Sequence, residues 1–176
     1  MHRSSYSPAR AVAVVGISAA AIECGKLALA ALPNIEVVSI LVAVFSYSFG
    51  YLGLLATVVF VAIEPMLYGF GSWVVSYIVY WPLLSLVFLL LGRLRVRNRW
   101  LVTCVAVLMT FFFGVLSSLV DVGLFSGFFE SFWARFSVYY VRGIVFYALQ
   151  IATNAVIFPL LFPFLTERLG KIAKKI

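Results

Sequence analysis

The stretch that decides the fold reads VVSILVAVFSYSFGYLGLLATVVFVAI, from Val37 to Ile63, and it contains no charged residue. Its 27 residues are many for one membrane-spanning helix, which needs about 20, and few for two. Gly50 lies at its centre and can supply a turn, because glycine readily adopts positive φ values. The stretch therefore predicts either one long helix or a hairpin of two short helices.

Four further apolar segments surround this stretch, at residues 11–32, 71–92, 100–120 and 137–165. Over the 176 residues, 65% are hydrophobic and 11% are charged, whereas a soluble domain is nearer half apolar and a quarter charged. A soluble chain of this length would expose large apolar patches, which drive association. We therefore expect one transmembrane domain over residues 1–176, with no room for a soluble catalytic domain.

The positions of the basic residues decide between one helix and a hairpin. Ten of the thirteen Lys and Arg residues lie in three clusters, at residues 3–10, 93–99 and 168–175. Such clusters mark cytoplasmic loops, and all three fall on one side only if residues 37–63 form a hairpin. We therefore predict an all-α integral membrane bundle of six transmembrane helices with cytoplasmic N- and C-termini, at about 11–32, 36–49, 51–64, 71–92, 100–120 and 137–165.

Several classes of function are disfavoured. The formal net charge of +7 would suggest nucleic acid in a soluble protein, but here the basic residues border apolar runs, so no nucleic acid is expected. Cys24 and Cys104 lie inside apolar segments, where small buried residues are expected rather than a disulfide or a metal site. The one histidine is His2, and no Walker, HExxH, CxxC or GxSxG motif occurs. We expect no metal, no cofactor and no enzyme activity.

Small residues recur every four positions in the first apolar segment, at Gly16, Ala20, Cys24 and Ala28. On a helix they form one ridge, and a ridge of small residues lets a second helix approach closely. The second helix belongs either to this bundle or to a partner protein. In the same segment Glu23 and Lys26 are three residues apart and can pair locally.

The predicted outer loops are acidic and aromatic, and the loop at residues 121–136 is long. Their rings form either a belt at the membrane interface or the wall of a ligand pocket with a few polar anchors. Gln150 and Asn154 share one helix face, which suits either an interhelical hydrogen bond or a ligand. Arg142 either reaches the interface or faces a partner. The candidate anchors are Asn34, Glu36, Glu64, Tyr68, Trp73, Tyr77, Arg142, Gln150 and Asn154.

Three short motifs carry a resemblance to a known family. They are Lys26-Leu27-Ala28-Leu29, Leu32-Pro33-Asn34-Ile35-Glu36 and Tyr68-Gly69-Phe70-Gly71-x-Trp73. With their surroundings, over about residues 20–95, they resemble the substrate-binding S components of energy-coupling factor (ECF) transporters, in particular the vitamin-binding group.

The resemblance implies a multi-pass subunit of the bacterial plasma membrane that takes up a vitamin from outside. It implies docking on a transmembrane T component through the ridge of Gly16, Ala20, Cys24 and Ala28, with ATP hydrolysed by two partner ATPase subunits. Cobalamin is the first expectation, because the similarity is greatest to the group that includes a cobalamin S component. His2 alone does not reproduce the histidine motif of metal-ion S components.

Two other classes stay open. A structural or assembly membrane protein would carry its aromatic residues as a belt without a concave pocket. An autonomous channel or carrier would transport without ATPase partners. A small membrane enzyme would need a cluster of acids, histidines or a nucleophile that this sequence lacks.

Overall fold

The computed structural model describes residues 7–32 and 35–173, apart from the side chains of residues 125 and 126. These residues form six α-helices and no strand, which confirms the all-α class. The helices are α1 (Pro8–Ala28), α2 (Val38–Phe49), α3 (Tyr51–Tyr68), α4 (Ser72–Arg93), α5 (Arg99–Ser126) and α6 (Phe132–Ala173). Five of them are long and apolar enough to cross a membrane, and α2 is the shorter exception.

The predicted hairpin turn lies at Gly50, which alone separates α2 from α3. Its φ of 61° and ψ of −124° lie in a region that residues with a Cβ rarely adopt. The Gly50 N–H donates to the carbonyl oxygen of Ser46 at 3.0 Å, which ends α2. The chain can therefore reverse without a loop, as the sequence predicts.

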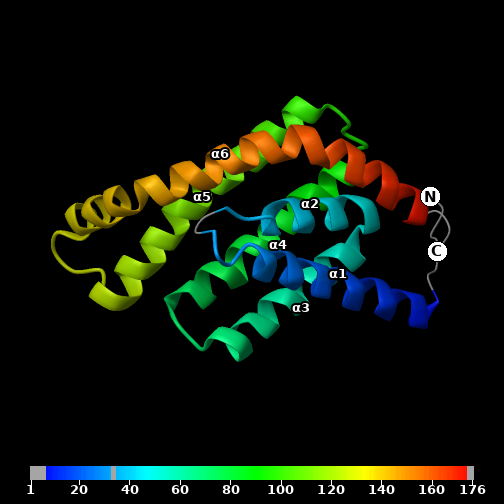
Figure 1. Ribbon diagram of the computed structural model, residues 1–176. Helices are drawn as coiled ribbons and strands as arrows, with labels where there is room; N and C mark the ends of the chain where they lie inside the picture. The colour runs from blue at the N-terminus through cyan, green and yellow to red at the C-terminus, as the bar shows by residue number, and fades with distance from the viewer. Residues whose placement is uncertain (1–6, 33–34, 174–176) are drawn as a thin grey trace.

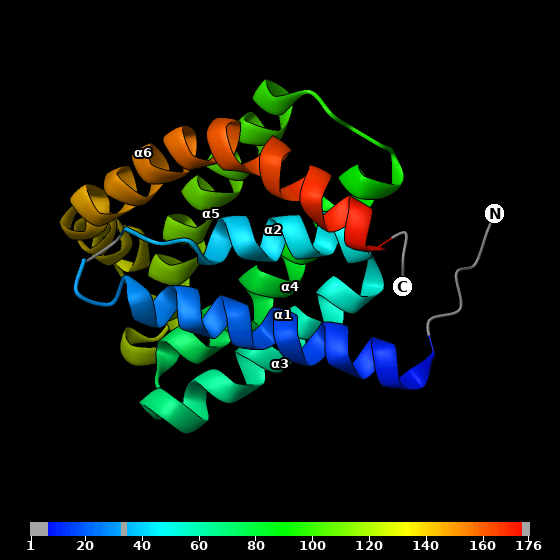
Figure 2. The same ribbon diagram turned by 45° about the vertical axis from the view of Figure 1, so that its right-hand side comes forward.

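The helices alternate in direction, so their connections gather at two ends of the molecule (Figures 1 and 2). One end holds the start of α1, the turn at Gly50, the connection from α4 to α5 and the end of α6. The Tyr47 hydroxyl ties this connection to α2 by donating to the carbonyl oxygen of Val96 at 2.9 Å. The segments that carry the three basic clusters lie toward this end, namely the start of α1, residues 93–99 and the last turns of α6.

Helix α2 lies at the centre of the bundle. It packs against α1, α3, α4 and α6, and nine of its twelve residues are buried. At 1.5 Å per residue it is about 18 Å long, against about 30 Å for the hydrocarbon core of a bilayer. The other helices therefore extend beyond its N-terminus, where residues 35–37 and a cavity lie.

Two glycines let α3 and α4 pack closely on α2. A Cβ atom at Gly53 would lie 2.5 Å from the carbonyl group of Phe45, and one at Gly92 would lie 2.4 Å from the carbonyl oxygen of Tyr47. Between α2 and α4 the hydroxyl oxygens of Ser46 and Ser85 are 2.7 Å apart. Such close contact is what holds helices together in lipid, where no hydrophobic force drives them into contact.

Several helix ends differ from the sequence prediction. Helix α1 ends at Ala28 rather than near residue 32, and α6 continues to Ala173 rather than ending near residue 165. Helix α3 continues through Pro65 to Tyr68 rather than ending near residue 64, α5 continues to Ser126 rather than residue 120, and α6 begins at Phe132 rather than residue 137. The predicted long outer loop at 121–136 is therefore wrong, because only residues 127–131 connect the two helices. Residues 121–126 contain no proline, and α5 ends where Gly127 adopts a φ of 69°.

The prediction that both cysteines are buried is also wrong. Cys24 and Cys104 are free and lie on the outside of the bundle. A membrane bundle meets lipid at its surface, and a thiol behaves there as a small hydrophobic group. An apolar sequence context in such a protein therefore does not distinguish inward from outward positions.

We expect the Gly92→Ala substitution to lower the free energy of unfolding by about 1–3 kcal/mol, because the added methyl group overlaps the α2 backbone. Thermal unfolding in detergent measures this loss. The matched control is Gly170→Ala in α6, where a Cβ meets nothing within 4 Å; it should leave the melting temperature unchanged or slightly higher. Equal melting temperatures for the two variants would contradict close packing at Gly92.

Candidate ligand-binding site

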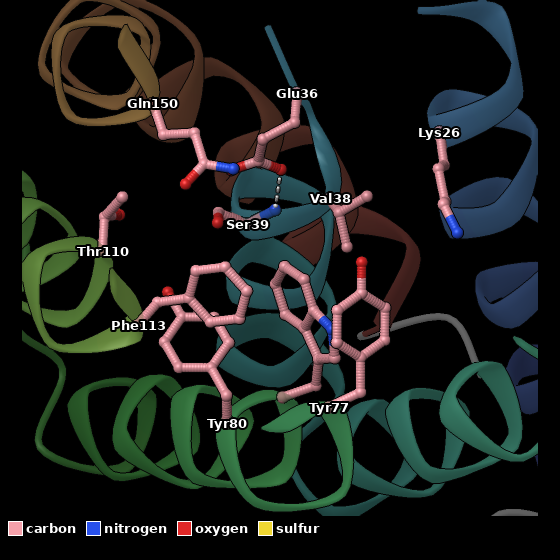
Figure 3. A pocket seen from close by; sticks show the side chains of 10 residues that line it. Lys26, Glu36, Val38, Ser39, Tyr77, Tyr80, Thr110, Phe113 and Gln150 are labelled. Atoms are coloured by element: carbon pink, nitrogen blue, oxygen red, sulfur yellow. Dashed lines mark hydrogen bonds between the residues drawn. The ribbon is translucent and has the colours of Figure 1, made fainter. Parts of the chain in front are cut away.

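A cavity of about 110 Å³ lies beyond the N-terminus of α2. Five of the six helices or their flanking residues contribute to it, and α3 approaches it through the Lys26 ion pair described below. Figure 3 shows polar side chains on one side of the cavity and aromatic rings on the opposite side. The lining residues are Lys26, Glu36, Val38, Ser39, Tyr77, Tyr80, Trp81, Thr110, Phe113 and Gln150.

Glu36, Ser39 and Thr110 form one wall, and Asn154 lies directly behind it. The Ser39 N–H donates to Glu36 Oε2 at 2.8 Å, so this carboxylate caps the N-terminus of α2, where negative charge is favourable. The fully buried side chain of Asn154 donates through Nδ2 to Glu36 Oε1 at 3.1 Å and to Thr110 Oγ1 at 3.0 Å. These bonds join the start of α2 to α5 and α6.

Four rings from α4 and α5 form the opposite wall. Tyr80 lies between Trp81 and Phe113, with ring centroids 4.9 Å and 4.7 Å away. Tyr77 meets Trp81 nearly perpendicularly at 5.6 Å. Tyr80 and Trp81 are buried, so their rings are held in place by the surrounding helices rather than by lipid.

Lys26 stands at the side of the cavity near α3. It forms an ion pair with Glu64 of α3, whose side chain is only 1% exposed, whereas that of Lys26 is 27% exposed. The Lys26 Nζ also lies 4.0 Å from the centroid of the Tyr68 ring. The Tyr68 hydroxyl donates to Glu23 Oε1 at 3.0 Å.

The expected pairing of Glu23 with Lys26 within α1 is therefore wrong. Lys26 pairs across to Glu64, since α1 packs against α3 and a buried carboxylate needs a countercharge. Sequence spacing predicts neighbours on one helix but not the partner that a second helix brings.

Three buried polar atoms near the cavity have no hydrogen-bond partner among the described residues. They are Gln150 Oε1, Asn154 Oδ1 and Trp81 Nε1. Leaving a buried polar atom unpaired costs about 1–3 kcal/mol, so native proteins contain few of them. Two of the three atoms, Gln150 Oε1 and Trp81 Nε1, belong to residues that line the cavity.

The structure brings most of the predicted anchors to this region. Glu36, Tyr77 and Gln150 line the cavity, and Asn154 lies directly behind Glu36. Trp73 packs against Tyr77, with ring centroids 5.1 Å apart.

The other predicted anchors have different places. Glu64 and Tyr68 hold Lys26 rather than lining the cavity. Arg142 lies on an exposed face of α6 and does not line the cavity. Asn34 lies outside the described residues.

The set of predicted anchors lacks several residues that line the cavity. Tyr80 and Trp81 belong to the aromatic cluster of α4, and Lys26 is the only lysine inside an apolar segment; both features are visible in the sequence. Thr110 gives a weaker signal, because single threonines are common in membrane helices. The acidic and aromatic loops point to the end of the bundle that holds the cavity but not to these helix positions.

The ridge predicted for docking faces outward. Gly16, Ala20, Cys24 and Ala28 are all exposed, so the ridge is not used for packing inside this bundle. Beside it, an apolar groove of about 500 Å³ runs between α1 and α3, lined by Gly16 and by larger residues that include Val12, Tyr51 and Leu55.

Comparison of the chain with protein-family models, with curated proteins and with solved structures finds no match. The class of the protein therefore rests on its own features. Five long apolar helices around a buried short one, with an outer surface rich in exposed hydrophobic side chains, define a helical membrane protein.

We expect Lys26→Met to lower the free energy of unfolding by about 3–5 kcal/mol, because it leaves the buried Glu64 carboxylate without its partner. Thermal unfolding in detergent checks this loss. A second substitution, Glu64→Leu, should restore much of the stability in the double variant. Lys171→Met, which removes an exposed ion pair with Glu167, serves as the control and should change little. A single Lys26→Met variant as stable as that control would contradict the role of the buried pair.

Proposed function

We propose that the chain is the substrate-binding S component of an ECF-type transporter, which captures a vitamin outside a bacterial plasma membrane and delivers it inward. The cavity carries this proposal. It combines an aromatic wall, a polar wall and buried polar atoms without partners, which is the composition of small-molecule sites. A purely structural membrane protein has no need for such a cavity.

The proposal includes the orientation. The end of the bundle that gathers the basic residues would face the cytoplasm, with six transmembrane helices and both termini on that side. The cavity lies beyond the N-terminus of α2, away from the basic end, and would receive its ligand from outside. Helix α2 would count as one of the six although it lies inside the bundle, because the chain changes sides along it.

The outward ridge supports docking on a T component. Its four residues are exposed, and a Cβ at Gly16 would meet nothing within 4 Å. A partner helix could therefore approach the α1 backbone closely. Since the chain contains no Walker motif, ATP hydrolysis would belong to two ATPase subunits bound to the T component.

The volume of the cavity bears on the choice of vitamin. Pockets for drug-sized ligands measure about 300–1,000 Å³, whereas this one measures about 110 Å³. Cobalamin is far larger than a drug-sized ligand. The cavity therefore favours a smaller vitamin over cobalamin, the first expectation from the sequence.

A structural or assembly role is the second candidate, and the aromatic residues in and next to the α5–α6 connection favour it. Phe128, Phe129 and Trp133 are 79%, 75% and 71% exposed, as expected for rings in an interface belt. These residues lie outside the cavity, so a belt and a ligand site can coexist in one protein.

Native mass spectrometry of the protein, purified gently from its own host, tests the proposed function. The expected result is a bound vitamin mass together with a T component and two ATPases. A chain that carries no ligand and no partners would favour the structural role. Vitamin uptake without any ATPase partner would favour an autonomous carrier.

We expect Ala20→Leu to weaken the complex with the T component while ligand binding stays intact. Overpacking by a larger side chain costs about 1–3 kcal/mol, which corresponds to a roughly tenfold to hundredfold weaker complex. Co-purification of the T component measures the effect. Ala148→Leu on the exposed face of α6 is the matched control, and equal recovery with both variants would contradict docking through the ridge.

In a chain whose Cys24 and Cys104 are replaced by Ala, we introduce Arg95→Cys as the single cysteine. We expect that a membrane-impermeant thiol reagent does not label this cysteine in sealed cells. The position lies in the basic α4–α5 connection, which the proposed orientation places inside. Permeabilised cells provide the control, because the same cysteine should then react fully. Labelling in sealed cells would show that the α4–α5 connection lies outside and would contradict the proposed orientation.

A further inference from the structure

The size of the cavity limits what it can hold. A cavity of roughly 150 Å³ in another protein accommodates a benzene molecule, and this one measures about 110 Å³. The space therefore corresponds to about one six-membered ring. A larger molecule would place only one ring inside and would extend past the partly exposed Lys26.

The shape and lining suit a flat ring. Tyr77, Tyr80, Trp81 and Phe113 cover one side, and Glu36 and Gln150 lie across the cavity from them (Figure 3). An aromatic ring gains most from offset or edge contacts with other rings. A planar guest on the aromatic wall would direct one edge toward the polar wall.

One lining residue of the polar wall has an acceptor without a partner among the described residues. It is Gln150, whose Oε1 accepts no hydrogen bond. Both oxygens of Glu36 already accept hydrogen bonds, from Ser39 and Asn154. A guest that brings an N–H or O–H donor to Gln150 would satisfy this acceptor.

The charges around the cavity disfavour an anion. The charged residues that line the cavity are Glu36 and Lys26, and Lys26 is itself paired with Glu64. The faces of the aromatic rings are also electron-rich and attract positive charge. With Glu36 capping the N-terminus of α2 and Lys26 already paired, the site favours a neutral or protonated ring over a carboxylate or phosphate.

We propose that the cavity binds a single nitrogen heterocycle bearing an amino group, whose N–H atoms donate to Gln150. This inference deepens the proposed function and rests on it only for the larger molecule, a vitamin, that would carry the ring. Gln150 selects the guest, because an occupant without a donor on that edge leaves its buried carbonyl oxygen unpaired.

Calorimetric titration of the full-length protein in lipid nanodiscs tests the inference with three probes. 4-Aminopyrimidine has the ring and the donor, pyrimidine lacks the donor, and pyridine-4-carboxylate replaces it with a negative charge. One buried hydrogen bond is worth about a factor of ten in affinity. We expect 4-aminopyrimidine to bind about tenfold more tightly than pyrimidine, and the carboxylate to bind most weakly.

Two variants test whether Gln150 causes the preference for 4-aminopyrimidine over pyrimidine. Gln150→Met keeps the length of the side chain but removes the amide acceptor, and it should bind 4-aminopyrimidine and pyrimidine equally. Gln150→Glu keeps an acceptor and should retain the preference for the amino probe. The inference is overturned if pyrimidine or the carboxylate binds as tightly as the amino probe, if Gln150→Met keeps the preference, or if no probe binds.

The inference and the proposed function can fail separately. If the protein binds 4-aminopyrimidine but purifies without a T component and ATPases, the ring site stands and the transport role falls. If a vitamin and the partners co-purify but no ring probe binds, the transport role stands and this assignment of the cavity falls.

Discussion

The structure depends on the close packing of the neighbouring helices around α2. In lipid, helices associate through contact and hydrogen bonding rather than through a hydrophobic force, so backbones must come near each other. Gly53 and Gly92 leave the space for this approach, and their Cβ atoms would otherwise overlap the α2 backbone. The hydroxyl pair of Ser46 and Ser85 adds a polar contact at the same place.

The cavity follows from the length of this central helix. Helix α2 is about 18 Å long, while its neighbours extend further, so its N-terminal end leaves room within the bundle. The positive end of its dipole faces that room, and Glu36 caps it. Glu36 in turn holds Asn154, so a single carboxylate connects the short helix to the polar wall of the site.

The surface of the bundle follows different rules from its interior. Because lipid surrounds the protein, large apolar residues, cysteines and a ridge of alanine and glycine all face outward. Inside the bundle, the buried carboxylate of Glu64 is instead paired across helices with Lys26. Because the ridge faces outward, the backbone of α1 is open to close approach by another helix.

The sequence alone determined the all-α class, the separate helices on either side of Gly50 and the gathering of basic residues at one end. These features depend on apolar length, on the conformational freedom of one glycine and on charge position, all of which are local. It also placed Glu36, Tyr77, Gln150 and Asn154 among the candidate residues. Only the tertiary structure decided that Lys26 pairs with Glu64, that Thr110 and Trp81 line the cavity, and that the cysteines face outward. In a uniformly apolar chain every helix face looks alike in sequence, so the packing of neighbouring helices decides which side chains meet.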